Sequence, residues 1–579
     1  MQAAYAKAYC AMPPPKSHNL QYLGGGGYDN EPAIQKNNII ALTMDVLEFE
    51  ENLATGAPIN CKECKALLNC TSKPNIIKQA TESIWKCEFC QFENHIIIDD
   101  AEIPLNSNVT YILEKSIEPK PQGIIEEIKE VPKLNTDDIS LIFCIDISGS
   151  MISGSMVGHT NIPDSKALKY VKNKKSPTRL ECVKIAVDSQ IQQLVKDNPN
   201  SKVGLVFFED AIHAYGDCTH PKQVIEGGVI QNYNEILAKA EAAALDSMQQ
   251  PVKNTSSALL QALKDINTMG CTALGPGLLF SLGLAKKGKR GSKIIICTDG
   301  LANRGLGSVE SQDAKVVEES RNFYNQVGLE AKESGVSISI ISIVESECRL
   351  DMLSPIADLT GGNILRVDPS KLGEDFTNCL GETMVATKVR FEVRIHKCFE
   401  FANVLFGQLS MDNSCLNREV GNATKDTMIS FEYRVKPMDS LKKMNIQDLS
   451  SIKQCPIQTC IFYENMKGWK CMKVLSKNYE VTQKEEEIEQ NKASHIIGSH
   501  HVQYAAGLSK KGDYKSAQMY TAMNMNLYAQ DATIQNQLMP MNLALEEQNA
   551  VPQLKGMPQM QMDSLTSKMN QAFKSAPKK

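Results

Sequence analysis

The sequence lacks the features that mark a membrane-spanning or a nucleic-acid-binding protein. No apolar run reaches the roughly 18–20 residues that a bilayer-spanning helix needs, and the first residues, MQAAYAKAYCAMPPPK, hold no apolar core of signal-peptide length. The net charge of −5 argues against binding driven by phosphate neutralisation. We therefore expect a cytoplasmic protein with no nucleic-acid partner and no transmembrane segment, for which peripheral membrane association stays open.

Motifs for catalysis are also scarce. There is no GxxxxGK[ST] phosphate-binding loop, and the chain has only nine histidines. The serine-rich turn ISGSM at 147–151 does not match the G-x-S-x-G elbow of a serine nucleophile. No RING-type spacing of metal ligands is present, which disfavours a ubiquitin-ligase subunit. We expect a protein that is not an enzyme.

A length of 579 residues is too great for one hydrophobic core and predicts a multidomain α/β chain. Shifts in composition and periodicity set the expected boundaries. We expect a disordered leader, a zinc ribbon with flanking strands, a linker, a doubly wound parallel-sheet domain, an antiparallel β-sandwich, a helical region and a mobile tail, at 1–36, 37–112, 113–135, 136–383, 384–482, 483–548 and 549–579.

The parallel-sheet domain is predicted from short apolar runs that read as strands buried on both faces. They lie at 140–145, 203–208, 293–297 and 338–344 and alternate with amphipathic helices. One helix is expected to begin after Ser176, which can cap it, with Pro177 in its first turn. In such a sheet, ligands bind at the carboxyl ends of the strands.

The later part of the chain changes pattern twice. Short alternating runs such as KVRFEVRI and MISFEYRV predict antiparallel strands of a sandwich. After the acidic KEEEIEQ, the pattern becomes helical, with a predicted hairpin turning near Gly512. The last 30 or so residues are rich in Met, Gln, Pro and Lys and are expected to be mobile.

Four cysteines have metal-ligand spacing. Cys61-x2-Cys64 is followed after 22 residues by Cys87-x2-Cys90, and two such knuckles complete a tetrahedral S4 site that suits structural Zn²⁺. Cys70 is a possible substitute ligand, but it belongs to no pair. Four unligated cysteines or a redox pair are the alternatives that the spacing leaves open.

The stretch CIDISGSM places oxygen ligands at the end of an apolar strand. Asp146, Ser148 and Ser150 alternate there, which is compatible with an ordinary turn, a serine nucleophile or a cation site. Carboxylate and hydroxyl oxygens are hard ligands that suit Mg²⁺ or Mn²⁺. Two further residues stand in matching settings, Thr272 before an apolar helix and Asp299 after another strand.

These five residues resemble the metal-ion-dependent adhesion motif (MIDAS) of von Willebrand A domains. The resemblance implies that Ser148, Ser150 and Thr272 coordinate magnesium through their hydroxyls. It implies that Asp146 and Asp299 hold the ion directly or through water, and that one position stays open for an acidic side chain of a protein partner. The loop that follows, 151–176, carries five lysines and one aspartate, and it can guide such a partner, cover the site or simply be solvated.

The cysteine block also resembles the zinc ribbon of the COPII inner-coat family. CKECKALLNC and IWKCEFCQFEN match its flanks, including Trp85, Phe89 and Asn94. The resemblance implies the order ribbon, von Willebrand A trunk, sandwich and helical domain, and a possible heterodimer with a related trunk protein. Too few residues follow the helical region for the family's gelsolin-like domain, so the family's activation of a small GTPase is not expected.

Three functions follow from these observations. The first is a non-catalytic interaction scaffold with a structural zinc ribbon and a magnesium-dependent face. The alternative is a divergent coat-like adaptor in intracellular protein transport from the endoplasmic reticulum to the Golgi. A subunit of a ubiquitin ligase or another enzyme complex is disfavoured.

Overall fold

The computed structural model describes most of the chain from residue 38 onward. Described are residues 8–9, 38–114, 139–154, 169–171, 177–549 and 559–574, apart from short gaps at 49, 51, 55, 80–81, 312, 345, 369–370, 447–452 and 483. The predicted leader (except 8–9), most of the predicted linker and most of the lysine-rich loop 151–176 lie outside the described residues.

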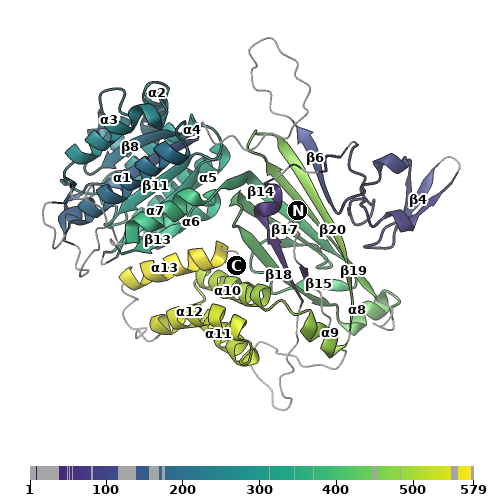
Figure 1. Cartoon of the computed structure of the whole chain (residues 1–579). Coiled ribbons are helices and arrows are strands. Elements are labelled where there is room, and N and C mark those ends of the chain that lie inside the picture. The colour runs from purple at the N-terminus through teal and green to yellow at the C-terminus, as the bar shows by residue number, and fades with distance from the viewer. Residues whose placement is uncertain are drawn as a thin grey trace, which may run out of the picture.

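The described parts form the kinds of unit that the sequence predicts. A three-stranded ribbon, a seven-stranded mostly parallel sheet with helices on both faces, two antiparallel sheets and a helical region are present. Figure 1 shows the parallel-sheet domain and the ribbon on opposite sides of the antiparallel sheets, with the helical region below. The predicted multidomain α/β fold is confirmed.

The parallel-sheet domain is built on five parallel strands with an antiparallel hairpin at one edge. The strand order is β10-β9-β8-β7-β11-β12-β13, and β9 pairs antiparallel with both of its neighbours, β8 and β10. The bounds are β7 Ser140–Asp146, β8 Lys202–Phe208, β9 Ile212–Gly216, β10 Gln223–Ile225, β11 Lys293–Thr298, β12 Ser337–Ile343 and β13 Ile364–Val367.

Both faces of this sheet are buried, which explains the unbroken apolar runs of its strands. On β7, Ile142 and Cys144 join the core beneath one helical layer, whereas Phe143 and Ile145 join the core beneath the other. The first layer contains α2 Tyr233–Ser247, α4 Leu274–Lys286, α5 Ala314–Ser334 and α6 Leu350–Thr360. The second contains α1 Arg179–Asp197, α3 Val252–Asp265 and α7 Leu372–Gly381.

Helix α1 begins two residues later than predicted. Its N-cap is Thr178, whose hydroxyl accepts the amide of Glu181, while the Glu181 carboxylate accepts the amide of Thr178. This capping box satisfies two otherwise unpaired amides, which a cap at Ser176 would not do. The prediction of the cap residue was therefore wrong, and the helix starts at Arg179.

The sandwich takes three strands, β1, β2 and β6, from the N-terminal part of the chain. One sheet has the order β16-β17-β14-β19-β20-β6, and the other has β1-β2-β18-β15. Their bounds are β1 Ala8–Tyr9, β2 Asn38–Thr43, β6 Asn108–Glu114, β14 Met384–Ile395, β15 Phe399–Ala402, β16 Gln408–Leu409, β17 Cys415–Thr424, β18 Met428–Val435, β19 Gln454–Glu464 and β20 Lys470–Glu480, with the short helix α8 Met438–Lys443. Figure 1 shows the purple N-terminal strands among green ones.

This placement corrects the predicted role of the strands that flank the cysteine block. We expected them to belong to the ribbon domain 37–112, but β2 pairs with β18 and β6 pairs with β20. The reason is burial: Ile40 and Leu42 of β2 lie in the sandwich core with Phe391 and Phe431. The ribbon itself keeps only β3 Ile76–Lys78, β4 Ser83–Lys86 and β5 Glu93–Ile96.

The helical region begins as predicted but extends further. It comprises α9 Glu485–Gln490, α10 Ser494–Lys510, α11 Tyr514–Leu527 and α12 Ala532–Asn549, and Gly512 turns the predicted hairpin with a φ of 82°. The expected mobile tail was wrong for residues 559–574, which form α13 Gln559–Lys574. Leu565 and Met569 of α13 are buried in one apolar cluster with residues of α10, α11 and α12, so apolar contacts hold this Met- and Gln-rich segment in place.

Helix α13 also covers the open edge of the parallel sheet. Asn570 Oδ1 accepts the amide of Ile364 at 3.1 Å, and Ser567 Oγ accepts the amide of Arg366 at 3.1 Å and donates to the Ile364 carbonyl at 3.0 Å. Edge strands present unpaired backbone groups that proteins usually cover. In this chain, side chains of a C-terminal helix pair with those of β13.

Candidate metal centres

Three segments converge at the carboxyl end of the parallel sheet. Asp146 is the last residue of β7, and Ser148 and Ser150 follow it directly. Asp299 follows β11, which is hydrogen-bonded to β7 in parallel register, so the two strand ends lie side by side. Thr272 stands two residues before α4.

The side chains of these five residues meet. Ser148 Oγ lies 3.0 Å from Ser150 Oγ, and Ser150 Oγ donates to Asp299 Oδ1 at 2.6 Å. A Cβ built on Gly300 would lie 3.5 Å from Ser150 Oγ and 3.6 Å from Thr272 Oγ1, so both hydroxyls face the same space. The structure therefore places every residue of the predicted adhesion motif at one site.

Asp146 is the most buried member of this group. Its side chain is inaccessible to solvent, Thr298 Oγ1 donates to Oδ2 at 2.6 Å, and the Ser148 amide donates to Oδ1 at 2.8 Å. Burial raises the pKa of Asp146 to about 7 in spite of these hydrogen bonds, and the charge of Asp299 adds to the shift. A cation among these oxygens would stabilise the ionised carboxylates.

The donor set fits a hard divalent cation such as Mg²⁺ or Mn²⁺, because all five side chains offer oxygen. Asp146 and Asp299 would supply charge, and the hydroxyls of Ser148, Ser150 and Thr272 would supply neutral ligands. The two carboxylates would balance the charge of a divalent ion, and an ion held by so few protein oxygens would accept a further oxygen ligand. Among described residues, the side-chain partners found for the two serine hydroxyls include no histidine, which disfavours the serine-nucleophile reading.

Sequence reasoning missed Arg179, which lies within this group. Its Nη1 is 2.7 Å from Asp299 Oδ2, and the two side chains are only 10% and 0% exposed. Arg179 and Asp299 are 120 positions apart in the sequence. An arginine in the first turn of a helix is, from sequence alone, typical of an exposed surface residue. No signal in a single sequence would have identified this pair.

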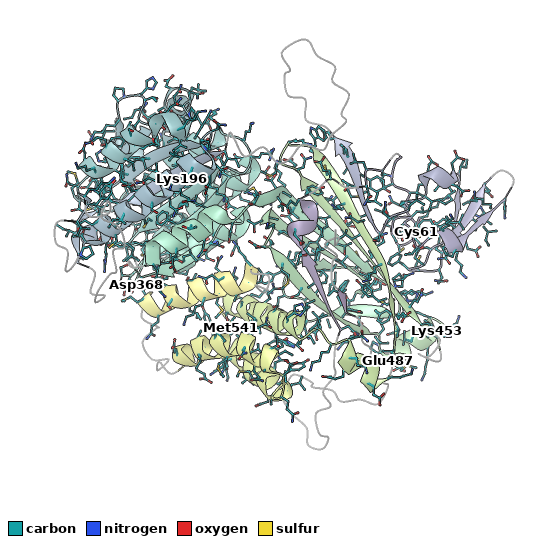
Figure 2. All side chains as sticks on the ribbon, viewed as in Figure 1. Cys61, Lys196, Asp368, Lys453, Glu487 and Met541 are labelled. Atoms are coloured by element: carbon teal, nitrogen blue, oxygen red, sulfur yellow. The ribbon has the colours of Figure 1, made fainter. Side chains whose placement is uncertain are left out.

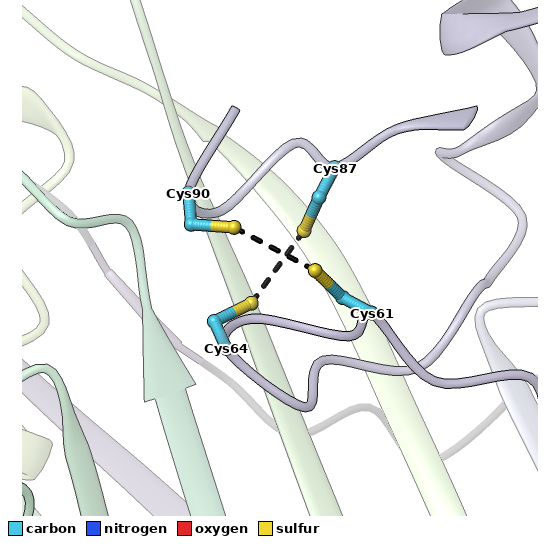
Figure 3. A group of neighbouring side chains, drawn as sticks. All are labelled: Cys61, Cys64, Cys87 and Cys90. Atoms are coloured by element: carbon cyan, nitrogen blue, oxygen red, sulfur yellow. Dashed lines mark hydrogen bonds between the residues drawn. The ribbon is translucent and has the colours of Figure 1, made fainter. Parts of the chain in front are cut away.

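The four cysteines of the predicted zinc site also lie together, in the ribbon. Two knuckles of the same shape present them: the amides of Lys65 and Gln91 donate back to the carbonyls of Cys61 and Cys87 at 3.1 and 2.8 Å. Lys65 and Gln91 both have positive φ, 63° and 66°. Each knuckle thereby aims two thiols inward, as Figure 3 shows.

The spacing of the sulfur atoms fits a tetrahedral zinc ion. All four Sγ atoms lie within 4.8 Å of one another, and the Cys61–Cys90 and Cys64–Cys87 pairs are 3.6 Å apart. Zn–S bonds of about 2.3 Å place the corners of a tetrahedron about 3.8 Å apart, whereas a disulfide needs about 2.05 Å. The cluster therefore fits zinc and does not fit a redox disulfide, and Cys70 is not part of it.

The surroundings of the thiols also favour a cation. The adjacent Cys64 and Cys90 side chains, together with burial, raise the pKa of the Cys87 thiol far above its ordinary value, so four thiolates need a positive charge between them. Asn94 Nδ2 donates to Cys61 Sγ at 3.4 Å, and Asn94 Oδ1 accepts the Lys62 amide at 2.8 Å. Asn94 thus holds the first knuckle as an outer-shell residue does.

A buried carboxylate ties the ribbon together behind the cysteines. Glu88 accepts hydrogen bonds from Asn69 and Ser72 at 2.7 Å each and from Trp85 Nε1 at 3.1 Å.

The two candidate cation sites belong to different domains: Figure 2 shows Cys61 in the ribbon and Lys196 of α1 in the parallel-sheet domain, on opposite sides of the sandwich. A change at one site is therefore expected to leave the other intact.

Comparison with known proteins identifies the parallel-sheet domain. A model of the Sec23/Sec24 trunk domain matches residues 173–378. This part of the chain is therefore similar to a Sec23/Sec24 trunk domain. The crystal structure of the human COPII-coat protein Sec24c shares the fold of the wider chain, with a TM-score of 0.55 and 12% identity, over 93% of this chain and 72% of that one.

The alignments with curated relatives cover a smaller share of the relative than of this chain. The chain is 27% identical over 492 residues to Circularly permutated Ras protein 1 of Dictyostelium discoideum, which covers 83% of this chain and 55% of that protein. It is 20% identical over 315 residues to Protein transport protein SEC24 of Coccidioides immitis, covering 52% and 31%. The chain thus spans about half or less of the length of these relatives. Among its described residues, no helix is long and apolar enough to cross a bilayer.

Proposed function

We propose that the chain is a non-catalytic protein–protein interaction scaffold, with a structural zinc ribbon and a trunk domain whose MIDAS face binds an acidic side chain of a partner through Mg²⁺. One observation carries the proposal: segments far apart in sequence bring Asp146, Ser148, Ser150, Thr272 and Asp299 to one end of the parallel sheet. A partner carboxylate would complete the coordination of the ion. The scaffold would act in the cytoplasm.

The experiment compares partner capture by the full chain and by Thr272→Ala, with and without Mg²⁺. Thr272 is buried and uncharged, so its replacement by alanine removes a neutral ligand without leaving a charge unpaired. Ser281→Ala is the matched control, because it removes a buried hydroxyl that bonds the Gly277 carbonyl in α4, away from the site. We expect Thr272→Ala to lose the partners that Ser281→Ala retains.

Chelation needs care in this experiment because EDTA also removes zinc. Partners that depend on the trunk face should be lost in EDTA and recovered when Mg²⁺ alone is added to zinc-loaded protein. Capture that survives both Thr272→Ala and removal of Mg²⁺ would contradict the proposal.

The second candidate function is a coat-like adaptor in transport from the endoplasmic reticulum to the Golgi. It is supported by the fold shared with Sec24c over 93% of the chain and by relatives named as transport proteins. A heterodimer with a related trunk protein would then form. Recovery of coat subunits in the same capture experiment, independent of Mg²⁺, favours this function, and their absence counts against it.

A further inference from the structure

Helix α1 delivers a fixed positive charge to the MIDAS. The amide of Arg179 donates to the Ser153 carbonyl at 3.1 Å, so the first residue of α1 is tied to the turn that carries Ser148 and Ser150. The capping box of Thr178 and Glu181 fixes the same helix end. The position of the Arg179 backbone is therefore set by the motif turn itself.

The Arg179 side chain and Ser150 together use both oxygens of Asp299. Oδ2 is paired with Arg179 Nη1 at 2.7 Å, and Oδ1 accepts the Ser150 hydroxyl at 2.6 Å. Both partners of the ion pair are buried or nearly so, with side chains 10% and 0% exposed. In such surroundings solvent screens the pair little, and the guanidinium neutralises a carboxylate that a metal would otherwise use.

The charge balance shows the consequence for a metal. The two carboxylates, Asp146 and Asp299, carry two negative charges when ionised, and Arg179 already cancels one of them. An ion bound to Asp299 Oδ2 at about 2.1 Å would lie within about 5 Å of Nη1. Two positive charges so close and so poorly screened repel each other, so the ion and the guanidinium compete for one carboxylate.

We propose that Arg179 is a tethered cation that occupies the Asp299 side of the MIDAS and lowers its affinity for divalent metal, so that metal loading requires displacement of the guanidinium. This inference rests on the proposed metal-dependent function. In this inference Arg179 is a positioning residue: it acts through Asp299 and sets the metal concentration at which the trunk face becomes able to bind a partner. The alternative is that Arg179 and Asp299 form a purely structural ion pair, and that this pair does not change the affinity of the site for metal.

The test measures Mn²⁺ binding to the zinc-loaded full chain by calorimetry and by electron paramagnetic resonance. Arg179→Gln removes the charge, and Arg179→Lys keeps it. Arg290→Gln is the matched control: Arg290 pairs with Glu464 at 2.8 Å at the boundary between trunk and sandwich, away from the MIDAS. The double variant Arg179→Gln with Thr272→Ala identifies binding at this site against binding elsewhere.

We expect Arg179→Gln to bind Mn²⁺ about tenfold to a hundredfold more tightly than the parent, with Arg179→Lys and Arg290→Gln close to the parent. The gain should disappear in the double variant. Because Arg179→Gln leaves Asp299 buried without its ion pair, it should melt at a lower temperature without metal and recover more than the parent when Mn²⁺ is added.

Three results would overturn the inference in distinguishable ways. If the parent and Arg179→Gln bind Mn²⁺ with equal affinity, Arg179 does not compete with the metal, although the chain still has a metal site. No Mn²⁺ binding by any variant overturns the proposed metal-dependent function and the inference with it. A gain that Arg179→Lys shares, or that Arg290→Gln reproduces, shows that the charge at this position is not the cause.

Discussion

Removing one carboxylate from α13 is predicted to detach this helix from the trunk. Asp563 is fully buried, and its two oxygens accept the amides of Cys348 and Leu350 at 2.7 and 2.8 Å. These amides open α6, whose own N-cap residue, Arg349, provides no side-chain cap. Asp563 therefore caps α6 from a helix more than 200 residues away, and it also faces Arg366 Nη1 at 3.5 Å.

The expected cost of Asp563→Ala follows from these contacts. Each buried amide that loses its acceptor costs about 1–3 kcal/mol, and the guanidinium of Arg366 loses its nearest carboxylate. We expect at least about 3 kcal/mol against the docked state of α13, which is about a hundredfold change in the docking equilibrium. The helix can leave as a unit, so the loss should appear locally and not as global unfolding.

Hydrogen exchange on the full chain measures this docking. The amides of Ile364 and Arg366 in β13 are bonded by Asn570 and Ser567 of α13, and their exchange should accelerate about a hundredfold in Asp563→Ala. Core strands such as β7 should keep their protection.

Lys568→Ala is the control on the same helix. Lys568 makes an exposed pair with Glu547 at 3.7 Å, so its loss should leave exchange in β13 unchanged. Unchanged exchange of the β13 amides in Asp563→Ala would refute the assignment of Asp563 as the anchor of α13.

Three further predictions concern the ribbon and the helical region. Cys87→Ser should remove one zinc per chain, measured with a chromogenic chelator, and should open the ribbon to protease, because a structural zinc ion held by the four cysteines would supply folding energy to the ribbon. Gln458→Leu should speed exchange in the ribbon near Leu67, since it deletes hydrogen bonds of 2.7 and 2.8 Å to the Leu67 amide and carbonyl. Burial, with His500 adding to it, lowers the pKa of His501 to about 3, below the value of about 6.5 in an unfolded chain. As the pH falls, the unfolded state therefore binds a proton at His501 that the folded state does not bind. The helical region should lose about 2 kcal/mol of stability between pH 7 and pH 5. Urea titrations at each pH measure this loss, and His501→Gln should abolish it.

The strands of the trunk could be predicted from sequence because their burial is local information. A strand covered on both faces is apolar at most positions, and the run of residues 141–145 before Asp146 shows this directly. The partners of β2 and β6 could not be predicted in the same way. Strand pairing depends on which distant segment meets the strand, and proximity to the cysteine block suggested the wrong domain.

In the candidate sites, too, features set by local sequence could be predicted, whereas contacts between distant residues could not. Fixed short spacings identify the cysteine knuckles, and the D-x-S-x-S turn led to Thr272 and Asp299 through the order of strands. Arg179 and Asp563 escaped prediction because each acts on a residue brought near only by the fold. Neither a helix-end arginine nor an aspartate in a Met- and Gln-rich segment differs in sequence from a solvated charge.

The pairing of β2 with β18 has a consequence for synthesis on the ribosome. Thr43 at the end of β2 pairs with Met428 at the start of β18, so about 385 residues must be added before the first residue of β18 emerges. At about 5–20 residues per second, β2 waits roughly 20–80 s without β18, with only the two-residue strand β1 available to pair with it, while the ribbon and trunk fold between β2 and β18. An exposed strand edge held for that long invites association with other chains, so the nascent protein is expected to depend on a chaperone that shields its N-terminal strand.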